Sequence, residues 1–164
     1  LKGEGMDAIV AVYSDWGIGA DGTQPIVLRA DRQRFVELTR GRTVIVGRRT
    51  LADFPGGRPL KGRRNIIITR QDIAVAGAEV AHGVQEAARL CGGDAIILGG
   101  QSVFREFIPL TDRVFVTKIM CCPQSDSYFE NLDESPEWRV ADQGKALREG
   151  DIEYRFMCYE RIRP

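Results

Sequence analysis

Short apolar runs alternate with helix-like segments along this chain. Residues 8–13, Ala-Ile-Val-Ala-Val-Tyr, form a continuous apolar run, which is typical of a central strand buried on both faces. Residues 30–40 have a helical pattern that stops at Gly41, a residue type that commonly closes a helix. The same signals predict strands at 43–46, 65–69, 94–98 and 113–119 and helices at 84–91 and 101–107.

The pattern changes after residue 137. Residues 138–140 and 152–159 have the pattern of antiparallel strands, and the second partly alternates apolar and polar positions. Strands that alternate with helices favour a parallel sheet, and the closing strands make that sheet mixed. We therefore predict an α/β fold: a three-layer sandwich with a central, mostly parallel mixed sheet, an antiparallel C-terminal strand and flanking helices.

The length of 164 residues favours a single domain with one sizeable core. We expect that domain to span residues 6–164, because Met6 is a plausible natural first residue. Residues 1–5 are interpreted as a leader or a cloning remnant.

Residues 14–28 show neither a helix nor a strand period. They contain Gly17, Gly19, Gly22 and Pro25, which are residue types that favour loops. A loop of this length in a compact domain is more often functional than incidental. Because it lies between the first strand and a helix that carries an acid, we expect it to act as a lid over a cleft.

Two predicted strands lead through glycine directly into a helix-like segment. One junction is Val46-Gly47-Arg48 and the other is Leu98-Gly99-Gly100-Gln101. Glycine lets a ligand approach the backbone, and the first N–H groups of a helix are unpaired donors that favour anions. Two such junctions suggest one ligand with several anionic groups, such as a dinucleotide.

The overall composition is that of an ordinary soluble domain, with zero net charge, 43% hydrophobic and 28% charged residues. Zero net charge argues against a nucleic-acid binder. Residues 29–70 nevertheless hold twelve basic and three acidic residues, a local excess of +9. The excess is compatible with solvated faces and also with a site for a polyanionic small molecule.

The four cysteines do not have the spacing of a disulfide framework or a zinc site. Cys121 and Cys122 are adjacent, Cys91 and Cys158 are isolated, and the chain has a single histidine, His82. Reduced thiols in a cytoplasmic protein are the simpler account, and no metal is expected. The apolar runs are too short to cross a membrane.

Asp31 is the candidate acid. An acid in the first turn of a helix commonly complements the helix dipole, which is the bland interpretation. However, Leu28, Asp31, Phe35 and Leu38 share one helix face through spacings of three and four residues, and that face is otherwise apolar. A carboxylate that faces the interior needs a partner or a raised pKa. We find no basic residue on this stripe, so the N–H groups of a ligand are the expected partner.

Other catalytic patterns do not appear in the sequence. G-x-S-x-G is missing, so Ser102 is interpreted as a helix-start residue. His82 stands alone and is interpreted as a surface or ligand-edge residue. Paired carboxylates and a Walker A pattern are also missing.

Taken in order, these residues resemble the dihydrofolate reductase family. The resemblance runs along nearly the whole chain from Met6, and the ordered set is specific although several members are weak alone. The matching positions are Ile9-Val10-Ala11, Ile18-Gly19, Pro25, Asp31, Phe35, Val46-Gly47-Arg48-Arg49-Thr50, Arg63-Arg64-Asn65-Ile66-Ile67, Ile97-Leu98-Gly99-Gly100, Thr117 and Asp126.

The resemblance implies NADPH-dependent reduction of 7,8-dihydrofolate to tetrahydrofolate, with hydride transfer to C6 of the pterin and protonation at N5. It implies that Asp31 is catalytic, binds the pterin edge and assists protonation through water, and that Thr117 supports it. Arg63 corresponds to the arginine that holds the glutamate carboxylate. The other implied substrate-binding residues are Ile9, Val10, Leu28, Arg32, Phe35, Phe54, Leu60 and Leu98.

The resemblance also implies an NADPH site. Arg48, Thr69 and Arg70 would hold the 2′-phosphate, which predicts NADPH over NADH, and the Gly99–Gly100 peptide is expected to be cis. Antifolate inhibitors are expected ligands, and a monomer is expected. The implied cofactor-binding residues are Ala11, Ile18, Gly19, Gly47, Arg48, Arg49, Thr50, Thr69, Arg70, Gly99, Gly100, Gln101, Ser102, Val103 and Phe104.

The chain departs from the family pattern at four positions. Ile26 stands where tryptophan is usual, Phe104 where tyrosine is frequent, and Gln101 where the third glycine of a triplet is usual. Arg32 occupies a position that is usually apolar or acidic. These changes bear on proton delivery, turnover and inhibitor affinity.

Two alternatives stay open at this point. A related reductase could act on another pterin or on a ribosylamino-pyrimidine, and Arg63 distinguishes this case because it has no clear purpose without a glutamate tail. A nucleotide-binding protein without catalysis is the other alternative, and Ile26 and Phe104 are the features that keep it open.

Overall fold

A computed structural model describes residues 5–162 of the chain. Residues 1–4 of the predicted leader, and residues 163–164, lie outside the described residues. Within the described part, a nine-stranded mixed sheet forms the centre of the molecule, and a separate two-stranded sheet joins β2 (Gly17–Gly19) to β8 (Ser127–Tyr128).

The main sheet has the strand order β10-β11-β7-β1-β6-β3-β4-β5, and β9 pairs with the other part of β11. Strands β1, β3, β4, β5, β6 and β7 run parallel to one another, whereas β11 is antiparallel to β7, β9 and β10. The predicted mixed sheet with antiparallel closing strands is confirmed. The strands are β1 (Met6–Val12), β3 (Thr43–Gly47), β4 (Arg64–Ile68), β5 (Glu79–Ala81), β6 (Ala95–Gly99), β7 (Thr111–Ile119), β9 (Trp138–Gln143), β10 (Leu147–Glu149) and β11 (Ile152–Arg161).

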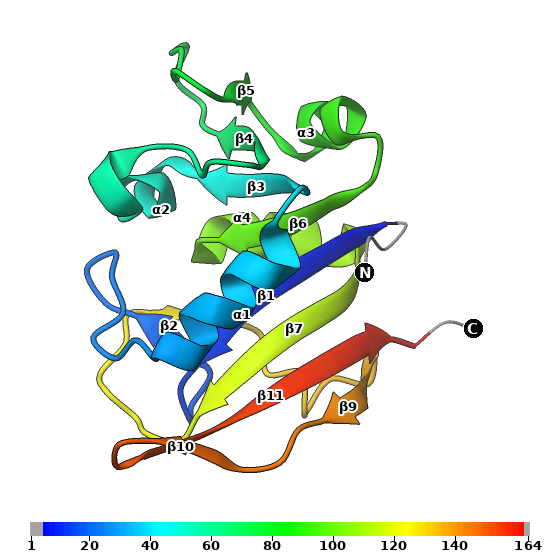
Figure 1. The fold of residues 1–164 in the computed structure, drawn as a ribbon. Helices are drawn as coiled ribbons and strands as arrows, with labels where there is room; N and C mark the ends of the chain where they lie inside the picture. Colours follow the sequence, from blue (N-terminus) through cyan, green and yellow to red (C-terminus); the bar gives the residue numbers. More distant parts are fainter. Residues whose placement is uncertain (1–4, 163–164) are drawn as a thin grey trace.

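The helices cover both faces of the sheet. On one face, α1 packs Phe35 and Leu38 against Ile9 of β1, and Figure 1 shows this helix crossing in front of the sheet. On the other face, α4 packs Val103 and Phe107 against the alternate residues of β1. Successive side chains of a strand point to opposite faces, so β1 is buried on both, as its apolar run predicts. The α-helices are α1 (Arg29–Thr39), α2 (Arg48–Ala52), α3 (Val84–Cys91) and α4 (Gln101–Phe107), with two 3-10 turns at Pro55–Gly57 and Ile108–Leu110.

The predicted helices and strands agree with the structure to within about three residues at each end. Short strands were missed, namely β2, β5, β8 and β10. Each has two or three residues, too few to show a period, and forms because a partner strand is presented to it.

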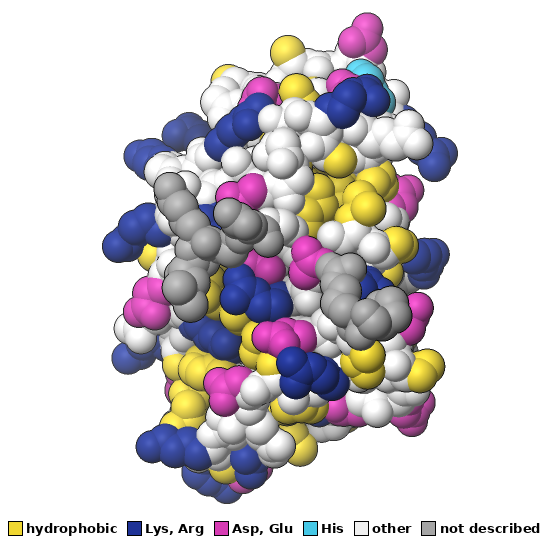
Figure 2. All heavy atoms as spheres, turned by 90° about the vertical axis from the view of Figure 1, so that its right-hand side faces the viewer, with side chains coloured by type: hydrophobic (Ala, Val, Ile, Leu, Met, Phe, Trp, Pro, Cys, Tyr) yellow, Lys and Arg dark blue, Asp and Glu magenta, His cyan; other side chains and the backbone are white. Residues whose placement is uncertain are grey.

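Strands β3 and β6 are neighbours and parallel, so both glycine junctions lie at the C-terminal end of the parallel strands. The helices that follow, α2 and α4, therefore begin side by side in space. Strand β1 begins and strand β11 ends toward the opposite end of the sheet (Figure 1). That side of the molecule carries acidic and basic side chains interspersed (Figure 2), rather than a field of one sign.

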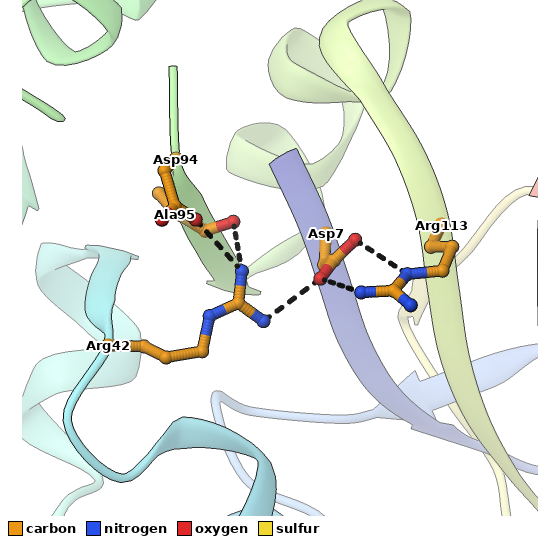
Figure 3. A network of polar contacts seen from close by, with 5 residues as sticks. All are labelled: Asp7, Arg42, Asp94, Ala95 and Arg113. Carbon is orange, nitrogen blue, oxygen red and sulfur yellow. Dashed lines mark hydrogen bonds and ion pairs between the residues drawn. The ribbon is translucent and has the colours of Figure 1, made fainter. Parts of the chain in front are cut away.

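A buried ion network joins four segments near the N-terminal ends of β1 and β6 (Figure 3). Asp7, which is 3% exposed, accepts hydrogen bonds from Arg42 Nη1 at 2.9 Å and from Arg113 Nε and Nη2 at 3.2 and 3.0 Å. Arg42 Nη2 donates to Asp94 Oδ1 and to the carbonyl oxygen of Ala95, each at 3.3 Å. The network ties β1 to β7, to β6 and to the loop before β3.

Candidate functional site

A cavity of about 230 Å³ opens where β1 and β6 end beneath α1. Its wall is mainly apolar, with the carboxylate of Asp31 among the lining groups. Of the predicted substrate and cofactor residues, twelve line it: Ile9, Val10, Ala11, Ile18, Gly19, Asp31, Phe35, Thr50, Leu98, Gly100, Gln101 and Phe104.

Asp31 lies in the first turn of α1 and accepts a hydrogen bond from Thr117 Oγ1 on β7 at 2.5 Å. Burial raises the pKa of Asp31 above the ordinary carboxyl value, and the Thr117 hydrogen bond and the charge of Arg34 act in the opposite direction. This carboxyl group can therefore exchange a proton nearer to neutral pH than an exposed aspartate can.

The interpretation that no basic residue shares the face of Asp31 is wrong. Arg34 lies three residues further along α1, and the pKa of each group responds to the charge of the other. The spacing of three residues is a signal that was present in the sequence. The arginine escapes an apolar-stripe analysis because its long stem packs like an apolar side chain.

A second cavity of about 1260 Å³ lies across the ends of β3, β4 and β6. Three arginines line it, Arg48, Arg49 and Arg70, although four acidic residues (Asp21, Asp53, Glu106 and Asp126) line it as well. The predicted cofactor residues found in this wall are Gly47, Arg48, Arg49, Thr50, Thr69, Arg70, Gly100, Gln101, Ser102 and Val103.

The two cavities share part of their walls, including Thr50, Gly100 and Gln101. The Gly99–Gly100 peptide at this boundary is cis, as expected. A Cβ added to Gly100 would lie 3.1 Å from Thr50 Oγ1, and one added to Gly47 would lie 3.0 Å from Val103 Cγ2. A side chain at either position would fill the space between the strand ends. Because glycine has no side chain, the backbone there stays open to a ligand. With the arginines, these features fit an extended ligand with phosphate groups.

The loop of residues 14–28 contributes to both cavities. Its strand β2 pairs with β8, and the N–H of Asp21 donates to Asp126 Oδ2 at 3.0 Å. Gln24 Nε2 donates to the carbonyl oxygen of Ala11 at 2.9 Å, which places that side chain across the end of β1. Sequence reasoning missed four lining residues of the small cavity because neither this loop nor β8 shows a period: Gly22, Thr23, Gln24 and Ser127. It also missed Asp53, which follows α2.

His82 lines the larger cavity, and its Nδ1 lies 2.9 Å from the carbonyl oxygen of Thr69. This position agrees with a ligand-edge residue. Phe104, which lacks the hydroxyl that tyrosine would carry, packs edge-on against Phe129 with ring centroids 4.9 Å apart. Ile26 is anchored through its backbone, because its N–H and carbonyl oxygen both bond to the hydroxyl of Tyr13.

Seven predicted site residues lie outside the two cavity walls. Phe54 and Leu60 pack in the same apolar cluster as Ile9, Phe35 and Leu98, next to the small cavity. Leu28 is buried, Thr117 acts from behind Asp31, Arg32 is exposed on α1, and Gly99 forms the cis peptide. The seventh is Arg63.

Arg63 is held from two sides. Its Nε donates to Thr39 Oγ1 at 3.1 Å, and its Nη1 donates to the carbonyl oxygen of Lys61 at 2.5 Å. Burial and the nearby charge of Arg40 lower the pKa of Arg63. Arg63 carries a positive charge and follows Phe54 and Leu60 of the apolar cluster along the chain.

No helix among residues 5–162 combines the length and apolar character that a membrane span requires. The same residues hold no group of three or more histidine, cysteine, aspartate or glutamate side chains that could bind a metal ion.

Comparison with known proteins places this geometry in context. The dihydrofolate reductase family model matches residues 5–161. The chain is 33% identical to a dihydrofolate reductase of Neisseria gonorrhoeae, with 92% of this chain and 94% of the relative covered. It is 34% identical to one of Mycobacterium tuberculosis, with 88% and 90% covered.

Among solved structures, a dihydrofolate reductase from Enterococcus faecalis complexed with NADP(H) and RAB-propyl superposes with a TM-score of 0.87 at 29% identity. The alignment covers 98% of each chain. The sequence match over nearly the full length thus agrees with the fold, the cis peptide and the carboxylate at the small cavity. The chain belongs to the dihydrofolate reductase family.

Proposed function

We propose that this protein reduces 7,8-dihydrofolate to 5,6,7,8-tetrahydrofolate with NADPH. The observation that carries the proposal is Asp31, a partly buried carboxyl group in the wall of a small apolar cavity. That cavity shares Thr50 and Gly100 with a larger cavity that carries three arginines. Family membership supports the same reaction. It does not favour the alternatives of another pterin or pyrimidine substrate or of a non-catalytic protein.

The small cavity is the proposed pterin site. Ile9, Phe35 and Leu98 supply apolar surface that packs against a flat heterocycle and excludes water. The ionised carboxylate of Asp31 is an acceptor for the adjacent N–H groups of a pterin edge. Thr117 fixes the carboxylate from the side of β7, so its orientation is set before a ligand arrives.

Proton delivery falls to the same residue. Because burial raises the pKa of Asp31, this carboxyl group keeps its proton to a higher pH than an exposed aspartate does. We propose that Asp31 passes a proton toward N5 through water. The reaction should then slow as pH rises and Asp31 loses its proton.

The larger cavity is the proposed cofactor site. NADPH, when bound, supplies the hydride that C6 of the pterin receives. The backbone N–H groups at the starts of α2 and α4 are suited to a pyrophosphate, and Arg48, Thr69 and Arg70 to a 2′-phosphate. Ala11, Ile18 and Gly19 line the small cavity, and they are the proposed contacts of the nicotinamide carboxamide.

Arg63 is the proposed contact for the glutamate tail of the substrate, and antifolate inhibitors are expected to compete for the pterin site. We further propose that the protein works as a cytoplasmic monomer. Its four cysteines are free thiols, as a reducing compartment would maintain them. Sedimentation equilibrium tests the monomer directly.

The reductase assay follows the loss of NADPH absorbance after dihydrofolate is added, from about pH 5 to pH 8. Turnover that depends on both substrates supports the proposal. Lack of turnover over this range, in protein that binds NADPH by calorimetry, would instead favour the non-catalytic alternative.

A further inference from the structure

Arg34 occupies an unusual environment for an arginine. Its guanidinium carbon lies 4.4 Å from the ring centroid of Phe156 and 5.7 Å from that of Phe115. Its Nη1 is buried and has no hydrogen-bond partner among the described residues. Two aromatic faces offset part of the cost of burying a cation, but a buried donor without an acceptor is still unfavourable. A long polar side chain would ordinarily rotate into solvent. The position of the Arg34 guanidinium against two aromatic rings therefore indicates that this residue has a role.

The two rings beneath Arg34 flank the hydrogen-bond partner of Asp31. Phe156 on β11 is the direct cross-strand partner of Thr117 on β7. Phe115 lies two residues before Thr117 and so shares its face of β7. Arg34 and Asp31 are three residues apart on α1, which places both side chains toward this part of the sheet. Arg34 and Asp31 therefore face the same group of three sheet residues: Arg34 lies on Phe115 and Phe156, and Asp31 is bonded to Thr117.

The titratable groups around Arg34 come from three elements. They are Asp31 on α1, Asp142 on β9 and Cys158 on β11, and Asp142 and Cys158 are cross-strand partners. Burial raises the pKa of the Cys158 thiol, which keeps that group uncharged. On β7, Arg113 lies 5.1 Å from the Phe115 ring and has its own carboxylate, Asp7. Thr117 is the uncharged group that contacts Asp31. Helix α1 carries two acids, of which Glu37 is exposed and Asp31 is partly buried, so Asp31 is the partly buried carboxylate on the helix of Arg34. Its hydroxyl partner, Thr117, leaves its negative charge uncompensated.

We propose that Arg34 is a positioning residue that acts through Asp31: its buried cation stabilises the ionised carboxylate from the side away from the cavity. Arg34 lines neither of the two cavities described above, so it does not touch the substrate itself. The inference rests on the proposed function, since it assigns the residue that sets the proton affinity of the acid in that reaction. Partly buried charges are screened less than exposed ones, so the effect persists in salt.

The direction of the effect follows from electrostatics. Burial raises the pKa of Asp31, and the charge of Arg34 lowers it. Without that charge, Asp31 should keep its proton to a higher pH. The pH at which the reaction slows should then move upward, because the protonated acid persists.

The test compares Arg34→Met, which keeps an unbranched apolar stem on Phe156, with Arg34→Lys, which keeps a cation. Arg29→Met removes the same charge from an exposed position on the same helix and serves as the matched control. Asp31 is titrated in each protein by carbon NMR of labelled aspartate carboxyl groups, in about 0.2 M salt to screen surface charges. Asp31→Asn identifies its signal, and the pH dependence of kcat is measured on the same samples.

In Arg34→Met we expect the Asp31 titration to move to higher pH and the ratio of kcat at pH 8 to kcat at pH 6 to rise about threefold or more. Arg34→Lys and Arg29→Met should stay close to wild type. An unchanged titration in Arg34→Met, or an equal shift in Arg29→Met, overturns the proposal. If Arg34→Met does not fold, Arg34→Gln replaces it and is judged by the same outcomes.

The NMR titration needs no turnover, so it separates this inference from the proposed function. A wild type that reduces dihydrofolate, with an unmoved titration in the variant, refutes the role of Arg34 alone. A wild type without turnover refutes the proposed function and leaves the titration to decide whether Arg34 controls Asp31.

Discussion

The hydroxyl of Thr117 donates a hydrogen bond to Oδ1 of Asp31 at 2.5 Å, although 86 positions separate the two residues. Thr117 lies on β7, next to the central strand β1, and Asp31 lies in the first turn of α1. The contact fixes the carboxylate between a sheet and the helix above it. It thereby sets the direction from which a ligand can meet the free carboxylate oxygen.

Asp31→Asn should lower turnover about a hundredfold or more at neutral pH, because an amide cannot donate or recover the proton. The assay is NADPH oxidation with saturating dihydrofolate. Glu37→Gln is the control, since it neutralises an exposed acid of the same helix. Turnover in Asp31→Asn equal to that of wild type would remove Asp31 from the mechanism.

The same variant should be more stable than wild type at neutral and alkaline pH. The raised pKa of Asp31 means that the folded state holds its proton more tightly than the unfolded state does. The stability that this proton contributes is present below the ordinary carboxyl pKa and is lost as pH rises through the folded pKa. Melting temperatures of the two proteins should thus converge in acid and diverge toward higher pH.

Thr117→Val should move the slowing of the reaction to higher pH, because the lost hydrogen bond normally lowers the pKa of Asp31. It should also weaken dihydrofolate binding about tenfold through the loss of a charge-assisted hydrogen bond. The pH profile of kcat/KM measures both effects. Thr117→Ser keeps the hydroxyl and should restore the wild-type profile, and a Val profile that matches wild type would contradict the assignment.

Arg63→Ala should raise KM for dihydrofolate roughly ten- to a hundredfold, the value of a charged hydrogen-bonded contact, and leave kcat nearly unchanged. KM for a pterin without a glutamate tail should barely change. Arg63→Lys should recover only part of the loss, because an ammonium group cannot bind a carboxylate in bidentate geometry. Equal effects on both substrates would show that Arg63 supports the fold through Thr39 instead.

Arg70→Ala should weaken NADPH binding about tenfold or more and leave NADH binding unchanged, because only NADPH carries the 2′-phosphate. Arg48 already donates to Gln71 Oε1, so Arg48→Ala should show the same selectivity to a smaller degree. The measurement is the ratio of KM values for the two cofactors. A parallel loss for NADH and NADPH would move these arginines away from the 2′-phosphate.

Asp7→Asn should destabilise the fold by about 3–5 kcal/mol, because it leaves two arginines without the buried carboxylate that they share. The side chain of Arg42 is 6% exposed and cannot readily turn to water. Asp94→Asn removes a partner that is 52% exposed and should cost less than about 1 kcal/mol. Urea unfolding of both variants checks the difference, and equal losses would contradict a special role for the buried carboxylate.

Local patterns predicted most of the architecture. The apolar run at 8–13, the glycine after residue 40 and the helix at 84–91 each depend on neighbours within a few residues, and each lies where it was expected. The two glycine junctions were also visible, because a close approach of backbone to ligand demands glycine wherever the strand lies. Asp31 stood out since its spacing places a charge on an apolar helix face.

What the sequence determined by itself was therefore the set of elements, the candidate acid and the glycine turns, all of which follow from short-range sterics and periodicity. The contact of Thr117 with Asp31 was implied by the family resemblance and follows from no local pattern. Only the tertiary structure decided that Arg34 lies on Phe156 and that β2 pairs with β8. These contacts join residues far apart in the chain. Their partners are chosen by packing of the whole sheet, which no local period encodes.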